Sequence, residues 1–430
     1  MSTLLFAPVT WNIAETSRMV EIAKVCRDQF AFECHFMGYG GDFVHLITDA
    51  GFAYHPQQPQ LTPQRIQELW KADRGERGGK MFTPQELIER GNSELALIAD
   101  LQPAAVVMGF TLSMYISARA AKVPLVVVCP LAFTRPFFEA GLATWPAQYD
   151  VGPLRLIPSA WKDRFLNWAG PRLKLWVRPF NQVAAHFGLP PFKYTVDLFA
   201  GDQTLVTHIP ELTGLHTLPP NWQYVGPIFA RLDGEIPAGI AQLPRDKPLL
   251  YFAMGSSANQ DVLLHIMQLL GELPYTVIAP IKAHLRGAAV SVPPNVHTFD
   301  WLPAHKVNPL AEVAVIHGGE GTVQTACASG TPFVGIGLQP EQDWNIEFMA
   351  RQGTAVRLPK YGVTRDQLHQ AIEHLRLDPQ VRQRAQEIQT LMANWPGAEN
   401  VAAFLAQRYS SEKKRTTENA ENKKSPRAQR

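Results

Sequence analysis

The sequence has few cysteines and no cysteine pair at short spacing. Four cysteines are spread over 430 residues, so there is no C-x-x-C motif: Cys26, Cys34, Cys129 and Cys327. This pattern excludes a disulfide framework and a cysteine-based zinc site. No charged N-terminal segment leads into a secretory apolar stretch. We therefore expect a reduced, cytoplasmic protein.

Long apolar runs and an excess of one charge are also missing. The apolar run at residues 123–130 is far short of the roughly 20 residues that a membrane-spanning helix needs. Forty basic residues against 38 acidic ones leave a net charge of +2, and residues 411–430 alone hold seven basic and three acidic residues. The remainder is nearly neutral, which argues against nucleic acid as a partner.

Two further classes of site are excluded by missing motifs. The chain has no D-x-D sequence and no His/Cys cluster with metal-ligand spacing, so we expect no metal ion. A glycine-rich stretch at residues 38–43 imitates a dinucleotide fingerprint, but Phe43 stands at the third glycine position. The sequence therefore does not predict a dehydrogenase.

Short apolar runs bounded by turn residues are what the chain does have. They predict buried parallel strands at residues 3–9, 104–110, 123–130, 248–255, 275–280, 312–319 and 332–337. Segments with helical periodicity lie between them, as at residues 17–30 and 261–273. This alternation is typical of α/β proteins with parallel sheets.

A Gly- and Pro-rich break divides the series into two similar halves. We predict an N-terminal domain at 1–222, a linker at 223–247, a C-terminal domain at 248–396, a helix at 397–410 packing back on the first domain, and a disordered tail at 411–430. Thr364 and Gln367 form a capping box for the first of the last helices.

Residues 130–199 are rich in tryptophan and basic side chains. One interpretation is an insertion whose aromatic residues pack on their own domain. The other is an apolar acceptor site or a peripheral contact with a membrane surface. The tryptophans concerned are Trp145, Trp161, Trp168 and Trp176.

The strongest chemical signal lies between residues 299 and 358. A predicted strand leads to His317-Gly318-Gly319-Glu320-Gly321-Thr322, and a helix follows. Glycines allow close approach of the backbone, and the N–H groups and dipole of a helix N-terminus favour a pyrophosphate. The loop alone is also compatible with simple strand-to-helix packing.

The surrounding residues make this stretch specific, because it resembles the donor-binding signature of glycosyltransferase family 1. That family includes the plant UDP-glycosyltransferases and the bacterial macrolide-type enzymes. The resemblance assigns the contact with the nucleobase to the segment around Trp301. It assigns contacts with the phosphates to the glycine-rich loop and to an earlier serine, and contacts with the sugar hydroxyls to an acidic residue followed by glutamine. The matching positions are Ser256, Trp301, Leu302, His317, Gly319, Gly321, Thr322, Glu341 and Gln342.

The resemblance implies the GT-B fold, in which two Rossmann-like domains with parallel sheets face each other across a cleft. It also implies that a sugar is transferred from a UDP-sugar with inversion and without a cofactor, and glucose is the first candidate for that sugar. Thr325 stands where plant enzymes carry a ribose-binding glutamate, which leaves dTDP-sugars open.

Two departures from the family pattern concern catalysis. The family's histidine base falls at Glu15, no histidine precedes His35, and the partner aspartate of the plant enzymes falls at Gly109. We predict Glu15 as the general base, because burial raises the basicity of a carboxylate. The alternative is that Glu15 only complements a helix dipole. For the acceptor we predict contacts with Asn12, Gly109, Phe110 and Trp145.

The sequence therefore predicts a UDP-dependent hexosyltransferase acting on a small apolar or aromatic acceptor. Two alternatives remain open at this stage. One is a non-catalytic GT-B protein that binds a nucleotide sugar or assists another enzyme, and the other is a sugar-nucleotide epimerase of the same fold.

Overall fold

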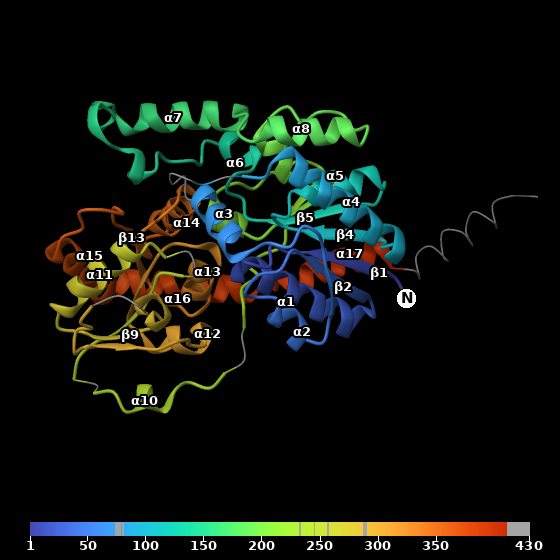
Figure 1. The fold of residues 1–430 in the computed structure, drawn as a ribbon. Helices are drawn as coiled ribbons and strands as arrows, with labels where there is room; N and C mark the ends of the chain where they lie inside the picture. Colours follow the sequence, from blue (N-terminus) through green and yellow to red (C-terminus); the bar gives the residue numbers. More distant parts are fainter. Residues whose placement is uncertain are drawn as a thin grey trace, which may run out of the picture.

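The computed structural model describes residues 1–73, 79, 81–231, 234–244, 246–255, 258–286 and 290–410. Two α/β domains lie side by side, each built on one parallel sheet (Figure 1). The predicted tail at 411–430 lies outside the described residues. The two sheets and their flanking helices confirm the predicted GT-B fold class.

The first sheet has the order β3-β2-β1-β4-β5-β6-β7, which begins with the strand order of a Rossmann fold. Its strands are β1 Thr3–Ala7, β2 Glu33–Gly38, β3 Ala53–Pro56, β4 Ala105–Met108, β5 Leu125–Cys129, β6 Gln203–Val206 and β7 Trp222–Tyr224. Its helices are α1 Ile13–Phe30, α2 His45–Asp49, α3 Pro63–Asp73, α4 Pro84–Leu101, α5 Ser113–Ala120, α6 Arg135–Glu139, α7 Ser159–Ala169, α8 Val177–His186 and α9 Pro210–Thr213.

The second sheet has the order β10-β9-β8-β11-β12-β13 and follows the short connecting helix α10 Ala238–Ala241. Its strands are β8 Leu249–Ala253, β9 Thr276–Ala279, β10 Val296–Thr298, β11 Val313–Ile316, β12 Phe333–Gly335 and β13 Ala355–Arg357. The helices are α11 Gln260–Gly271, α12 Ala304–Val307, α13 Glu320–Ala328, α14 Pro340–Arg351, α15 Arg365–Leu377, α16 Pro379–Ala393 and α17 Gly397–Tyr409.

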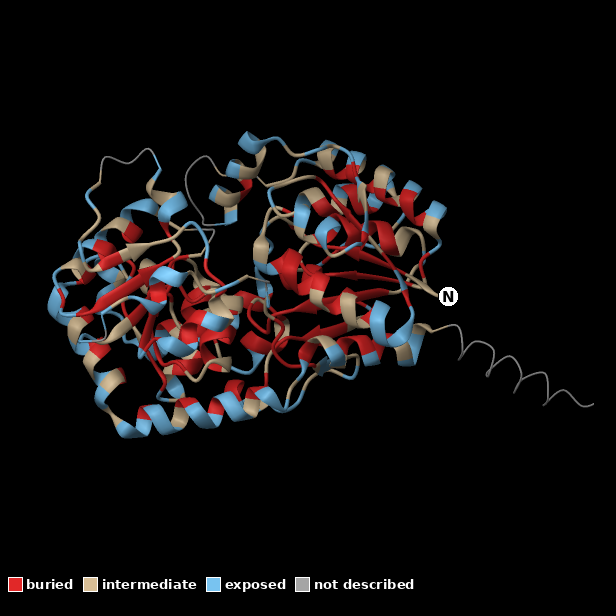
Figure 2. Ribbon diagram, turned by 90° about the horizontal axis from the view of Figure 1, so that it is seen from below, coloured by how far each residue is buried: buried red, intermediate tan, exposed pale blue. Residues whose placement is uncertain are grey.

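The central strands are buried on both faces, as their continuous apolar sequences predict. Figure 2 shows the strands as buried, with helices outside them whose outer faces are exposed. All seven predicted apolar runs are strands (β1, β4, β5, β8, β9, β11 and β12), and Thr364 forms its capping box with Gln367. The strands that the sequence did not reveal include all four sheet edges, β3, β7, β10 and β13.

The chain passes between the domains at two places that lie against each other. The first follows β7, and the second joins α16 to α17, which packs on α1 of the N-terminal domain. Asn400 Nδ2 donates to the Val225 carbonyl at 2.7 Å. A Cβ on Gly397 would lie 2.4 Å from the Pro227 oxygen, and one on Gly226, at φ +94°, 2.7 Å from Trp395 Cβ. These glycines therefore allow the two crossings to pack tightly.

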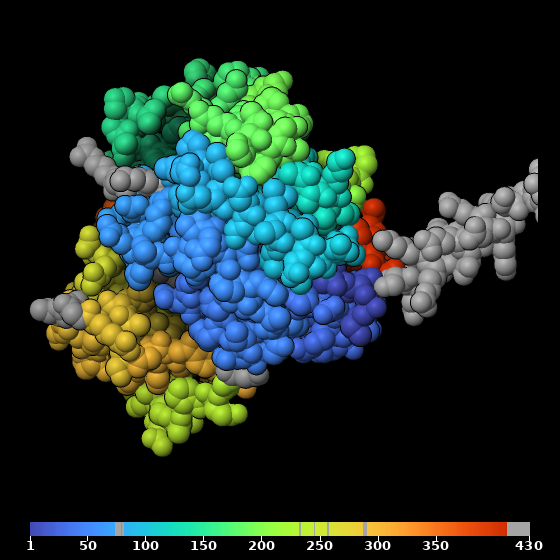
Figure 3. All heavy atoms as spheres, turned by 45° about the vertical axis from the view of Figure 1, so that its right-hand side comes forward, coloured from blue at the N-terminus to red at the C-terminus, as the bar shows by residue number. Residues whose placement is uncertain are grey.

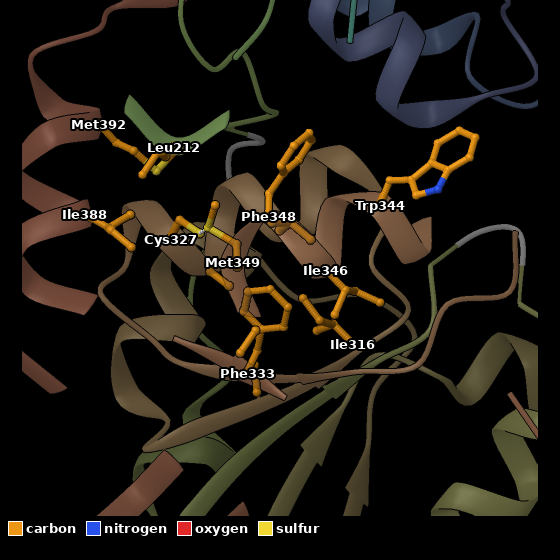
Figure 4. Packing of buried hydrophobic residues seen from close by; sticks show 14 of the residues in the cluster. Leu212, Ile316, Cys327, Phe333, Trp344, Ile346, Phe348, Met349, Ile388 and Met392 are labelled. Carbon is orange, nitrogen blue, oxygen red and sulfur yellow. Dashed lines mark hydrogen bonds between the residues drawn. The ribbon is translucent and has the colours of Figure 1, made fainter. Parts of the chain in front are cut away.

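A hydrophobic cluster continues from one domain into the other (Figure 4). Trp344 of α14 is 4% exposed, and its ring centroid lies 4.9 Å from that of Phe137 and 5.4 Å from that of Phe133. Its indole Nε1 donates to the Thr144 carbonyl at 2.8 Å. Trp344 thus joins the C-terminal domain to the aromatic residues after β5.

Trp344→Ala is expected to lower the free energy of unfolding by about 3 to 5 kcal/mol, the usual cost of truncating a buried aromatic residue. Denaturant unfolding measures the change. Trp161→Ala, at a residue 71% exposed, is the control and should change stability by no more than about 0.5 kcal/mol. Equal stability of the two variants would show that Trp344 does not hold the domains together.

Candidate active site

A cavity of about 1120 Å³ lies between the two domains. Its walls come from loops at the carboxyl ends of parallel strands, where open α/β sheets bind ligands. The N-terminal wall includes the loops after β1 and β4, and the C-terminal wall includes those after β8 and β11. The predicted donor and acceptor residues can therefore be located relative to one shared cavity.

Most of the predicted donor residues share the C-terminal wall. The cavity is lined by Trp301, Leu302, His317, Gly319, Gly321, Thr322, Glu341 and Gln342. Ser256 lies outside the described residues. The helix α13 begins after Gly319, so its N-terminal turn faces the cavity, and free N–H groups of such a turn favour an anion.

His317 is enclosed by two glycines. A Cβ on Gly255 would lie 2.4 Å from His317 Cε1, and one on Gly319 would lie 2.4 Å from His317 Nε2. Burial lowers the pKa of His317 to about 4, so the imidazole is neutral at pH 7. Among the described residues its buried Nδ1 has no hydrogen-bond partner. A contact of the imidazole with the Ala253 backbone opposes the lowering of the pKa.

The acidic-Gln pair at the start of α14 has two different environments. Gln342 is buried, and its Oε1 accepts from the Leu338 N–H at 2.9 Å. Glu341 accepts from Asn345 Nδ2, and burial raises the pKa of Glu341 to about 8. Gln342 is thus bonded to the backbone, whereas Glu341 is bonded to a side chain. Glu341 is therefore the member of the pair that can form hydrogen bonds with a polar ligand.

On the N-terminal wall, Asn12, Phe110 and Trp145 line the cavity. The Oδ1 of Asn12 caps α1, accepting from the N–H groups of Ala14 at 3.0 Å and Glu15 at 3.3 Å. Trp145 Nε1 is buried without a partner in the described part of the chain. Gly109 is buried behind Glu15 and contributes no side chain to the wall.

Glu15 lines the cavity in the first turn of α1, with 3% of the residue exposed. Its Oε1 accepts from the Phe110 N–H at 3.0 Å, and its Oε2 lies 3.5 Å from Arg18 Nη1. A Cβ on residue 109 would lie 2.0 Å from Glu15 Oε1. Burial raises the pKa of Glu15 to about 6, although the Arg18 charge opposes this shift.

Arg18 and Glu320 form a buried ion pair between the domains, which the sequence analysis did not identify. Glu320 also accepts from the Thr207 hydroxyl and from Gln324 Nε2, the latter at 3.2 Å. Arg18 therefore lies between two carboxylates, Glu15 of its own helix and Glu320 of α13. The sequence feature that could have identified this pair is the charged residue Glu320 between Gly319 and Gly321.

A second missed residue is Arg90 of α4. It is 4% exposed and lines the cavity, with its guanidinium over the rings of Tyr39 at 3.8 Å and Phe82 at 4.1 Å. Arg90 and Glu94 fall on the apolar face of α4 among Leu87, Leu97 and Ile98. Two charged residues at positions i and i+4 on an otherwise apolar helix face were the sequence feature that could have identified Arg90.

Two kinds of feature are missing from the described residues. None of their helices combines the length and the apolarity needed to cross a membrane. No group of three His, Cys, Asp or Glu side chains among them is arranged to hold a metal ion.

Comparisons with known proteins find similarity to glycosyltransferases. Residues 264–407 match the C-terminal domain model of the erythromycin biosynthesis protein CIII-like family. A "PGL/p-HBAD biosynthesis glycosyltransferase" of Mycobacterium tuberculosis (strain ATCC 25177 / H37Ra) is 25% identical over 392 residues, covering 90% of this chain and 87% of the relative.

Solved structures share the fold over almost the whole chain. The glycotransferase of kitacinnamycin has a TM-score of 0.70 at 17% identity, covering 95% of this chain and 99% of its own. The glycosyltransferase VinC, solved in complex with dTDP, has a TM-score of 0.63 at 20% identity, covering 94% and 100%. The chain thus matches the C-terminal domain model of this macrolide-biosynthesis family in its second half, its relatives are named glycosyltransferases, and it shares the GT-B fold with solved glycosyltransferases.

Proposed function

We propose that the protein transfers a sugar from a UDP-sugar to a hydroxyl of an apolar or aromatic acceptor, with inversion at the anomeric carbon. Glucose is the first candidate for the sugar. The observation that carries the proposal is the meeting of two helix N-termini at the cavity. A Cβ on Gly321 of α13 would lie 3.9 Å from the Cβ of Ala14 of α1. The donor loop and Glu15 therefore lie on facing walls of one space.

The C-terminal wall supplies the groups that a leaving diphosphate needs. The N–H groups at the start of α13 and the Thr322 hydroxyl are donors, and His317 adds a neutral imidazole. Fixed donors aimed at developing negative charge lower the barrier without reorganisation. Trp301 is 42% exposed and lies on the same wall, where its ring offers a stacking surface for a base.

The N-terminal wall supplies the base. Glu15 would take the acceptor proton while the hydroxyl oxygen attacks the anomeric carbon, the bond to the diphosphate breaks, and positive charge develops on the sugar ring. A pKa of about 6 leaves Glu15 mostly ionised at pH 7 yet more basic than an exposed carboxylate. The surrounding apolar wall, with Phe82, Phe110 and Trp70, suits an apolar or aromatic acceptor.

Glu15→Gln is expected to reduce turnover about 10²- to 10⁴-fold while leaving the dissociation constant for UDP unchanged, because it removes basicity on the wall opposite the donor. Free UDP release in the presence of acceptor measures turnover. Glu21→Gln, on the same helix in a surface pair with Lys24, is the control and should keep full activity. Full activity of Glu15→Gln would exclude Glu15 as the base.

The wild-type enzyme is expected to lose kcat/KM about tenfold per pH unit below about pH 6. Burial raises the pKa of Glu15 to about 6, so protonation removes the base as the pH falls through this value. Measuring kcat/KM against pH with a water-soluble phenolic acceptor tests for this acidic fall. A flat profile between pH 5 and 7 would contradict the assignment.

His317→Ala is expected to weaken UDP binding about ten- to hundredfold, equal to the roughly 1.5 to 3 kcal/mol of a hydrogen bond to a charged group. Calorimetry measures the affinity. His374→Ala, exposed on α15, should bind UDP like the wild type. Unchanged affinity and turnover in His317→Ala would assign that residue a packing role only.

UDP and dTDP are expected to bind within about tenfold of each other, since a single neutral hydrogen bond contributes little more than about 1.5 kcal/mol. Thr325 is buried and its hydroxyl donates to the Gly321 carbonyl at 2.7 Å, so it offers no carboxylate to a ribose 2′-hydroxyl. Competition calorimetry with the two nucleotides tests this. A preference for UDP above a hundredfold would require another group that reads the 2′-hydroxyl.

A further inference from the structure

Helix α7 exposes its aromatic residues to solvent. Trp161, Phe165 and Trp168 are 71%, 57% and 60% exposed, and their spacing places them on one face of the helix. Lys162 and Leu166, on the other side, face the protein. This is the reverse of the usual surface helix, whose apolar stripe is buried.

Neighbouring segments extend this face. Leu156 before α7 is 87% exposed, and Leu173 and Leu175 after it are 41% and 53% exposed. Figures 1 and 3 show α7 and α8 along the outer edge of the molecule, and in Figure 1 α8 lies above the N-terminal sheet while α7 extends toward the side of α14. We call these six residues the outer apolar patch: Leu156, Trp161, Phe165, Trp168, Leu173 and Leu175. A concentration of exposed apolar side chains in one segment marks an interaction site.

The exposed charges within residues 151–178 have one sign. Between residues 151 and 178, all of which the structure describes, the exposed charged residues are Arg155, Arg164, Arg172, Lys174 and Arg178. The acidic residues nearby are engaged, Asp150 by Lys162 at 2.6 Å and Asp163 by the Trp145 N–H at 2.6 Å. Apolar aromatic residues flanked by basic ones fit a lipid surface with anionic headgroups.

The patch is also continuous with the cavity. Leu173 and Leu175 belong to the patch and line the cavity, together with Trp176 and with Leu166 on the inner side of α7. An apolar path therefore leads from the outer edge of the N-terminal domain to the wall that holds Glu15. A water-soluble acceptor has no need of such a path.

We propose that the outer apolar patch docks on a membrane containing anionic phospholipid and that the acceptor enters the cavity from that lipid phase. Trp161, Phe165 and Trp168 enter the interfacial region, and the five basic residues contact headgroup phosphates. The membrane-docking step stands on the patch alone, whereas the entry of the acceptor rests on the proposed transferase activity.

The test is binding of the full-length protein to vesicles of phosphatidylcholine with and without phosphatidylglycerol, measured by co-sedimentation. Binding is expected with phosphatidylglycerol and should weaken with salt. Trp161→Ser/Phe165→Ser/Trp168→Ser and, separately, Arg164→Gln/Arg172→Gln/Lys174→Gln should each lower the partition coefficient by about tenfold or more. Tyr361→Ser/Leu377→Ser removes two exposed apolar residues of the other domain and should bind like the wild type.

Turnover of a water-soluble phenol separates this inference from the proposed function. Both triple variants should keep that turnover and the affinity for UDP within about twofold. If the protein transfers a sugar but its vesicle binding does not depend on the patch, docking is overturned and the proposed function stands. If it binds vesicles through the patch but transfers no sugar, the proposed function is overturned and docking stands.

Two other results would overturn docking. One is a wild-type dimer that the aromatic triple variant converts to a monomer in light scattering, which would assign the patch to a second copy of the chain. The other is vesicle binding that survives both triple variants but is lost on removal of residues 411–430, which hold seven basic residues.

Discussion

The Arg18 guanidinium, buried between a carboxylate of each domain, constrains how the two halves of the enzyme meet. Glu15 shares its helix, and Glu320 begins α13 of the other domain. A buried charge that loses its partner is strongly destabilising, so the domains cannot separate here without hydrating all three groups. The contact thereby fixes the start of α13, which holds the donor loop, against the start of α1, which holds Glu15.

The two positions that depart from the family pattern, Glu15 and Gly109, lie in direct contact. The Glu15 carboxylate fills the space beside residue 109, where any side chain would collide with it. The site that lacks the plant enzymes' aspartate thus still contains a carboxylate, supplied by α1 instead of the loop after β4. Phe110 N–H and Arg18 hold that carboxylate in place, which explains how it tolerates burial.

The sequence was sufficient to predict seven of the nine interior strands and to single out residues that share the C-terminal wall of the cavity, because both depend on local patterns. Apolar runs such as that of β5 are buried on both faces, and the loop from His317 to Thr322 is contiguous. Edge strands such as β3 and β13 are short and partly exposed, so their composition does not distinguish them from loops. Trp344 and the Arg18–Glu320 pair depend on contacts 200 and 302 residues apart, which periodicity cannot reveal.

The adjacent chain crossings near Gly226 and Gly397 have a mechanical consequence. Because both connections pass through one tightly packed point, relative motion of the domains reduces to rotation about a single hinge. Displacement about such a pivot grows with distance from it, and away from the two crossings the domains are also joined where Gln339 Nε2 donates to Asp73 at 2.8 Å. Any rotation at the two crossings must therefore strain this hydrogen bond and the buried Arg18–Glu320 pair, which both join the two domains.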